Sequence, residues 1–176
     1  ISGCANFMPD VLLPLANDLF IASDGGKTLK RWSCPTGGGV ADDNASWTLR
    51  EAVAVAPVLL PGVAGKPARL IAADSTGGVT LFGLDRTDNL IRRWVPGVTA
   101  ALPQGRIASD IGVHTDAAGR TLVAYAVNRK QIVCVDADAD APKWITPAVD
   151  DASASIVGSP VSLADGRWLV TDLGGR

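Results

Sequence analysis

The chain has 176 residues and a net charge of −2, and 47% of its residues are hydrophobic. Seventeen Asp stand against a single Glu, Glu51, alongside 19 Gly and 11 Pro. Asp, Gly and Pro favour turns, whereas helix surfaces are rich in Glu and Lys, so this composition excludes a helical bundle or a coiled coil. The hydrophobic content excludes an intrinsically disordered chain. We therefore expect a turn-rich, all-β domain.

Charge and hydropathy limit the partners and the compartment. No basic run exceeds the pair Arg92-Arg93, so the chain lacks the clustered Lys and Arg that nucleic acid requires. The longest apolar stretch, residues 52–60, is too short for a transmembrane helix. Residues 1–4, Ile-Ser-Gly-Cys, resemble the lipobox of bacterial lipoproteins. They suggest an extracytoplasmic protein, periplasmic or membrane-anchored; the alternative is a cysteine in a loop or a first strand.

Strand–turn–strand patterns recur along the chain. Segments 20–27, 70–78 and 168–176 each join an apolar run to an Asp/Gly turn, which predicts a β-hairpin. Segment 123–130 is a variant without glycine, in which Asn128 takes the positive-φ position. Each hairpin is preceded by a short apolar segment, and these are residues 9–13, 56–60 with Pro57, 110–113, and 159–163 with Pro160.

Each complete repeat closes on a tryptophan. Trp47, Trp94 and Trp144 are separated by 47 and 50 residues. Four short strands in roughly 50 residues is the size of one β-propeller blade. The sequence therefore predicts four-stranded antiparallel blades over about 1–50, 51–98 and 99–148, with a partial blade over 149–176.

The repeats resemble those of the quinoprotein-type, or PQQ-like, β-propellers. In that family a Pro-Val strand and a hairpin lead to a segment that runs from Asp to Trp. Asp85 to Trp94 resembles this segment with one extra residue, and Asp136 to Trp144 has the family's spacing. The resemblance covers nearly the whole chain, and it implies a propeller without specifying a function.

The resemblance implies two classes of function. Quinone-dependent enzymes of the family bind pyrroloquinoline quinone and calcium through Glu, Asn and Asp, but the only Glu here is Glu51, so that site cannot be carried over. Other members are binding scaffolds. We expect a non-catalytic scaffold that presents loops to a protein partner or a small ligand. The alternative is a fragment of a PQQ- and calcium-dependent alcohol or sugar dehydrogenase.

The length of the chain limits how many propeller blades it can form, and so whether it can close a ring of blades. At about 50 residues a blade, 176 residues supply roughly three and a half blades, whereas closed propellers need at least about four. We expect an incomplete ring, or a ring completed by another chain. That chain would be a second copy, making a homodimer, or a different protein.

The candidate chemistry is sparse. Asp136, Asp138 and Asp140 alternate as in the start of a calcium loop, although Asp-rich turns between strands are more often simply solvated. His114, the only histidine, lies between Asp110 and Asp116 and could work in acid–base chemistry with Ser109. The alternative is a histidine without a catalytic role.

Several further features are assigned from the pattern alone. Trp32 and Trp168 fall outside the tryptophan repeat, so they are the candidates for a ligand-stacking surface. Cys134 lies in an apolar run and is predicted to be a buried free thiol, while Cys4 and Cys34 could pair. Residues 35–46, with three consecutive glycines, are predicted to form an inserted loop.

Overall fold

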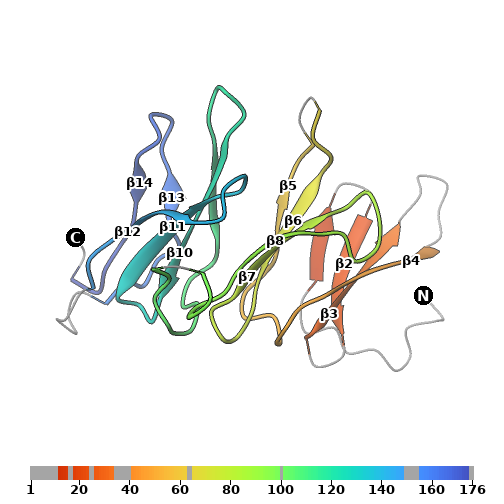
Figure 1. Cartoon of the computed structure of the whole chain (residues 1–176), viewed down its shortest axis with the longest axis horizontal. Coiled ribbons are helices and arrows are strands. Elements are labelled where there is room, and N and C mark those ends of the chain that lie inside the picture. Colours follow the sequence, from red (N-terminus) through yellow and green to blue (C-terminus); the bar gives the residue numbers. More distant parts are fainter. Residues whose placement is uncertain are drawn as a thin grey trace. The chain divides into compact units, whose positions relative to one another are not determined.

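The computed structural model consists of β-strands joined by turns (Figure 1). It describes residues 12–15, 18–23, 26–33, 41–62, 65–99, 101–148 and 155–174, with only the backbone described for 12–15, 18–23, 32–33 and 41–44. All the regular structure within these ranges is β-strand, and none of it is helix. The predicted all-β class is therefore confirmed.

The strands form sheets in simple chain order. Among the described residues, three sheets have four strands each, and a fourth sheet has two. The first three sheets are β1 (Leu12–Leu15), β2 (Asp18–Ser23), β3 (Thr28–Ser33) and β4 (Ala41–Thr48); β5 (Val58–Leu60), β6 (Arg69–Ala73), β7 (Val79–Gly83) and β8 (Leu90–Trp94); and β9 (Gly112–Thr115), β10 (Thr121–Val127), β11 (Gln131–Asp136) and β12 (Pro142–Ile145). The two-stranded sheet pairs β13 (Val161–Ser162) with β14 (Trp168–Leu169). Neighbouring strands pair antiparallel, so each sheet is a meander of hairpins.

The hairpin turns have the residues that their backbone requires. Gly26, with φ +83°, lies in the turn between β2 and β3, and Asn128 and Arg129 both have positive φ between β10 and β11. Asn tolerates this conformation better than most residues, so the predicted role of Asn128 is confirmed. Gly77, with φ +89°, is needed for a second reason, because a Cβ atom there would lie 2.1 Å from the carbonyl oxygen of Gly105.

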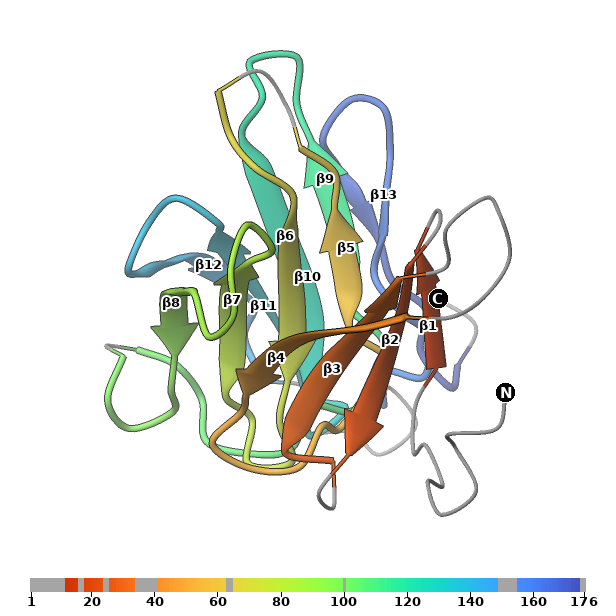
Figure 2. The same cartoon turned by 90° about the vertical axis from the view of Figure 1, so that its right-hand side faces the viewer.

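Contacts within the chain define two compact units. The first consists of Ile1–Asp74 and Thr80–Ile91, and the second of Ser75–Val79 and Arg92–Arg176. In the first unit, side chains from β3 and β4 meet side chains from β6 and β7 in one apolar core. Figure 2 shows these four strands. Its buried members are Leu29, Ala45, Trp47, Leu49, Leu70, Ala72, Phe82 and Leu84. Two four-stranded sheets therefore share this core.

Trp47 fixes how these two sheets meet. Its side chain is completely buried, and its indole N–H donates to the carbonyl oxygens of Gly83 at 2.9 Å and Arg86 at 3.1 Å. In the same turn, Asp88 accepts a hydrogen bond through Oδ1 from the backbone N–H of Thr48. The last strand of the first sheet is thereby joined to the turn between the last two strands of the second.

The second unit repeats this arrangement. The buried indole of Trp94 donates to the carbonyl oxygen of Ala139, in the turn between β11 and β12. Beside it, the Arg92 guanidinium pairs with the Asp140 carboxylate. Trp144 is half-buried and packs against the unit's apolar core, together with Trp168. These three tryptophans thus contribute to packing.

The segments that link the sheets also recur. Val53 forms an isolated antiparallel bridge with Asp74, Ile107 with Val127, and Ile156 with Asp172. In each case the linking segment pairs with a residue at the end of the second strand of the sheet that follows it, or within three residues beyond that end. Pro57 and Pro160 are both buried, one residue before β5 and β13. These bridges give corresponding positions in successive sheets.

One predicted loop is wrong in extent. Residues 41–46, placed in an inserted loop by their glycine-rich neighbours, belong to β4, which pairs with β3 through Ala41 and Asp42. Cross-strand hydrogen bonding to β3 outweighs the weak strand propensity of an Ala-Asp-Asp-Asn segment. Residues 34–40 lie outside the described residues, and so do Cys4 and Cys34 with their predicted pairing.

We expect Trp47→Ala to lower the free energy of unfolding by about 3–5 kcal/mol, because it empties a large part of a buried core. Trp47→Phe should cost less, about 1–3 kcal/mol, because it keeps most of the apolar volume but leaves the carbonyl of Gly83 without its donor. Urea denaturation of each variant measures both values. Val98→Ala, at a side chain that is 78% exposed, is the control and should change the free energy by less than about 0.5 kcal/mol. Equal losses for Val98→Ala and Trp47→Ala would contradict this role for Trp47.

Candidate functional site

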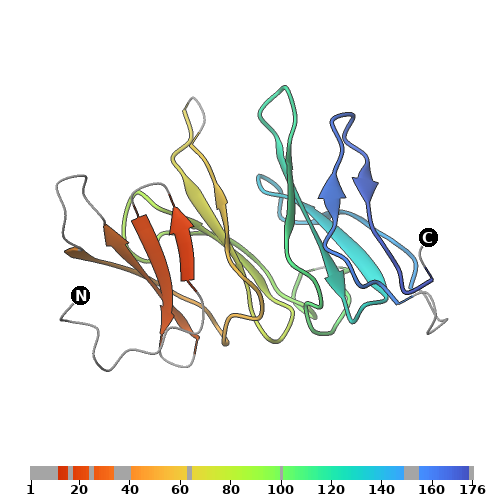
Figure 3. The same cartoon turned by 180° about the vertical axis from the view of Figure 1, so that it is seen from behind.

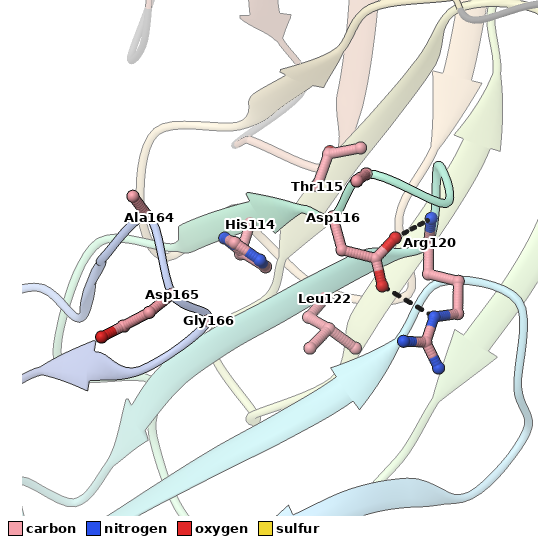
Figure 4. Close-up of a pocket in the computed structure, with 9 residues that line it drawn as sticks. His114, Thr115, Asp116, Arg120, Leu122, Ala164, Asp165 and Gly166 are labelled. Atoms are coloured by element: carbon pink, nitrogen blue, oxygen red, sulfur yellow. Dashed lines mark hydrogen bonds and ion pairs between the residues drawn. The ribbon is translucent and has the colours of Figure 1, made fainter.

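A hollow of about 360 Å³ lies in the second unit, between the β9–β10 hairpin and the β13–β14 turn. These two hairpins lie side by side in the view from behind (Figure 3). The lining residues come from both, and they are His114, Thr115, Asp116, Ala117, Arg120, Leu122, Ala164, Asp165 and Gly166. The hollow therefore has a polar rim and a partly apolar floor (Figure 4).

The turn between β9 and β10, which runs from Asp116 to Arg120, forms one edge of the hollow; we call it the first lip. Asp116 follows β9, and its Oδ1 accepts hydrogen bonds at 2.9 Å from the backbone N–H groups of Ala118 and Arg120. Its Oδ2 lies 2.7 Å from Nε of Arg120. Gly119, with φ +76°, allows the chain to close this turn. One carboxylate thus orders the loop and neutralises the arginine beside it (Figure 4).

The second lip has the same chemistry in a shorter turn. Oδ1 of Asp165 accepts a hydrogen bond from the backbone N–H of Arg167, and Oδ2 lies 2.7 Å from Nη2 of the same residue. Gly166, with φ +81°, stands between them. Because each carboxylate at the rim has its own arginine partner, neither lip carries an isolated charge.

The pKa of the Asp116 carboxyl lies below its ordinary value. The hydrogen bond from the backbone N–H of Arg120 is the main cause, because it favours the ionised form. The side-chain hydrogen bond and the positive charge of Arg120 lower the pKa further, while partial loss of solvent opposes them. Asp116 is therefore a fixed carboxylate at neutral pH and not a proton donor.

His114 stands between the two lips. It lies on β9, is half-buried, and directs its ring toward that of Trp168 in an edge-on contact, with the ring centroids 6.4 Å apart and the planes at 70° (Figure 4 shows the histidine). The described residues provide no hydrogen bond to its ring nitrogens. The imidazole can therefore both donate to and accept from a molecule in the hollow.

The structure gives Ser109, the predicted partner of His114, other hydrogen-bond partners. Ser109 is buried, and its Oγ accepts from the backbone N–H of Ala126 at 2.9 Å and donates to the carbonyl oxygen of Asp110 at 3.0 Å. The Asp110 carboxylate accepts from Ser159. Ser109 and Asp110 thus hold the linking segment in place, and the hydroxyl of Ser109 is committed to backbone groups.

The structure does not gather the three aspartates of the predicted calcium loop. Oδ1 of Asp136 accepts from the backbone N–H of Asp138, which closes a turn, while Asp140 pairs with Arg92. Among the residues with described side chains, no group of three His, Cys, Asp or Glu is placed to hold a metal ion. Asp85 has a related turn role, accepting from Asn89 at 2.5 Å.

Two other ionisable side chains are buried in the same sheet. Cys134 is a free, buried thiol, as predicted, and burial raises its pKa to about 12. Tyr125 is also buried, burial raises its pKa, and its hydroxyl has no hydrogen-bond partner in the described part of the chain. Both groups are protonated at neutral pH, so neither supplies a nucleophile.

Sequence reasoning missed most of this site. It identified His114 and Asp116, but not Arg120, Leu122 or the Asp165-Gly166 turn. A signal was present, since an Asp, a Gly and an Arg recur in the first hairpin of two successive repeats. Of the predicted stacking residues, Trp168 supports His114 from the core and does not line the hollow, and the side chain of Trp32 is not described.

No protein-family model matches the chain, and no curated protein is significantly similar to it. Within the described residues, no helix is long and apolar enough to cross a membrane.

We expect the effect of Asp116→Asn on stability to depend on pH. Because the folded-state pKa lies below the ordinary 3.8, the carboxylate stabilises the fold above that pH, and this contribution is lost as the pH falls through the folded-state pKa. The wild type should therefore melt at a higher temperature than the variant at about pH 7, and the gap should close in acid. Thermal melts across this range test it, and a gap that does not change with pH would contradict it. The gap should persist in about 1 M salt, because a direct hydrogen bond is its main cause.

Cys134 should resist alkylation by iodoacetamide while the protein is folded. The thiolate is the reactive form, and burial both raises the pKa to about 12 and shields the sulfur. Mass spectrometry of the peptide that contains Cys134 should show the adduct only after denaturation. Rapid labelling of the folded chain at about pH 8 would be inconsistent with this burial.

Proposed function

We propose that the chain is part of a PQQ-like β-propeller that acts as a non-catalytic binding module. The repeated tryptophan contact carries this proposal. Trp47 and Trp94 each donate to the turn between the last two strands of the sheet that follows in sequence. Blades of a propeller are stacked four-stranded meanders, and a contact that recurs from one meander to the next is what such stacking requires.

In this proposal the blades are those that the sequence predicts, over about 1–50, 51–98 and 99–148, with a partial blade over 149–176. The four-stranded order of β1–β4, β5–β8 and β9–β12 supports these boundaries. The lipobox-like residues at Cys4 support a location outside the cytoplasm, in the periplasm or at a membrane anchor.

The hollow beside His114 is the binding site that we propose. Its two carboxylates are neutralised by Arg120 and Arg167, so a charged ligand would gain little there. His114 offers a donor and an acceptor, and Leu122 provides apolar contact. We therefore propose a small, uncharged, hydroxyl-rich ligand.

Binding is favoured over catalysis by where the reactive groups are. The Ser109 hydroxyl is bonded to backbone groups, Cys134 and Tyr125 are buried, and Asp116 is held as a carboxylate. Among the described residues, none of these groups supplies a nucleophile beside His114. Hydrogen bonding by His114 therefore supports binding as the role of the hollow.

The single histidine allows a direct test. Because His114 is the only one in the chain, its ring resonances in a ¹H–¹³C spectrum are unambiguous. We expect them to shift in a saturable way with at least one of glucose, ribose and N-acetylglucosamine, added to about 10 mM, which would detect a Kd near 1 mM. No shift with any of the three sugars would overturn the proposed ligand class.

Variants place the response in the hollow. Leu122→Trp should fill the floor and abolish the shift, and His114→Gln, followed through the backbone amide signals of the 116–120 turn, should weaken binding. Val98→Ala lies away from the hollow and should bind like the wild type. A shift that survives Leu122→Trp unchanged would place the ligand elsewhere.

A further inference from the structure

The two lips of the hollow share one pattern of backbone hydrogen bonds. In the turn 116–120, the N–H of the first residue donates to the carbonyl oxygen of the fifth at 3.0 Å, and the N–H of the fourth donates to the carbonyl oxygen of the first at 2.9 Å. In the turn 163–167 the same two hydrogen bonds measure 2.8 and 2.9 Å. The fourth residue is a glycine in both, Gly119 with φ +76° and Gly166 with φ +81°. The two glycines therefore hold equivalent positions with nearly the same backbone.

The two glycines differ in what a side chain at their position would meet. A Cβ atom built on Gly119 has no atom within 4 Å apart from its chain neighbours. A Cβ atom built on Gly166 lies 3.8 Å from Nε2 of His114, which is the one atom within that range apart from the chain neighbours. Figure 4 shows the ring of His114 beside the turn that carries Gly166. Gly166 thus borders the space in front of Nε2, and Gly119 does not.

Nε2 of His114 is available to a ligand from this side. The described residues provide no hydrogen bond to the ring nitrogens, so Nε2 can bond to a hydroxyl group. A hydroxyl oxygen bonded to a ring nitrogen lies about 2.7–3.0 Å from it. On the side that faces residue 166, such an oxygen would overlap a Cβ atom placed 3.8 Å from Nε2. A hydroxyl can therefore reach Nε2 from this side only while residue 166 has no side chain.

We propose that a hydroxyl group of the ligand bonds to Nε2 of His114 in the space beside Gly166, and that the glycine determines which groups fit there. This inference rests on the proposed function, because it takes a hydroxyl-rich ligand to bind in the hollow. It adds the atom that makes the bond and the residue that limits the size of the group at that atom. Gly166 is a specificity-determining residue in this proposal, whereas Gly119 serves only its turn.

Two matched variants test the role of Gly166. The wild type, Gly166→Ala and Gly119→Ala are each titrated with glucose, ribose and N-acetylglucosamine, and the ring resonances of His114 are followed. Gly166→Ala should raise the Kd about fivefold or more, because its Cβ takes the place of the hydroxyl. Gly119→Ala should keep the Kd within about twofold, because its Cβ meets nothing. Both place Ala at a positive φ, so both should lower the melting temperature by a similar amount.

A second measurement uses the wild type alone. His114 is the only histidine, so a ¹H–¹⁵N spectrum of the imidazole contains a single pair of ring nitrogens. Adding the sugar that binds should shift the Nε2 signal more than the Nδ1 signal. This result does not depend on how well either variant folds.

The outcomes separate this inference from the proposed function. A wild type that responds to none of the three sugars would overturn both. A wild type that binds a sugar as tightly as Gly166→Ala does would overturn this inference and leave the ligand class in place. An equal loss of affinity in Gly119→Ala would also overturn it, since backbone strain in a lip would then be the cause. So would a response confined to Nδ1 of His114.

Discussion

A four-stranded antiparallel sheet has two faces, and it cannot bury either one by itself. The rest of this structure depends on how each sheet covers its faces with a neighbouring sheet. In each unit a tryptophan on the last strand of one sheet is buried and bonded to the final turn of the following sheet, Trp47 to Gly83 and Arg86, and Trp94 to Ala139. The indole supplies apolar area, and its N–H satisfies a carbonyl that stacking would otherwise leave without a donor. One side chain thus fills the apolar space between the two sheets and also satisfies a buried carbonyl.

The hollow follows from the same architecture. Stacked meanders place their first hairpins beside one another, and in the second unit both hairpins end in an Asp–Arg pair. The carboxylates order the turns before any ligand arrives, so a ligand would lose little entropy in ordering them. His114 can be aimed into this space because Trp168, in the next sheet, fixes one edge of its ring.

The fold was more predictable from sequence than the site. Hairpins can be predicted from local sequence, through Asp/Gly turns and through an Asn at position 128 that accepts positive φ. The spacing of Trp47, Trp94 and Trp144 indicates the repeat. The hollow depends instead on two turns 49 residues apart, Asp116 and Asp165, which nothing local connects. The alternation of Asp136, Asp138 and Asp140 suggested a shared cation. A carboxylate can equally pair with a nearby backbone N–H or a basic side chain, and Asp140 pairs with Arg92. The strand over residues 41–46 was missed because pairing with β3, and not its own composition, decides its conformation.

The prolines of the first strands have a consequence for how the chain avoids misassembly. Strands β1, β5, β9 and β13 are all sheet edges, and an exposed edge can recruit a stray strand. Pro14 lies within β1, and Pro57 and Pro160 immediately precede β5 and β13. A proline has no N–H to offer to an incoming strand, so the edges at β1, β5 and β13 are poor templates for amyloid-like growth, whereas β9 has no such proline. A β-protein built from repeated hairpins faces this hazard at every repeat, and at these three strands a proline near the start of the repeat reduces it.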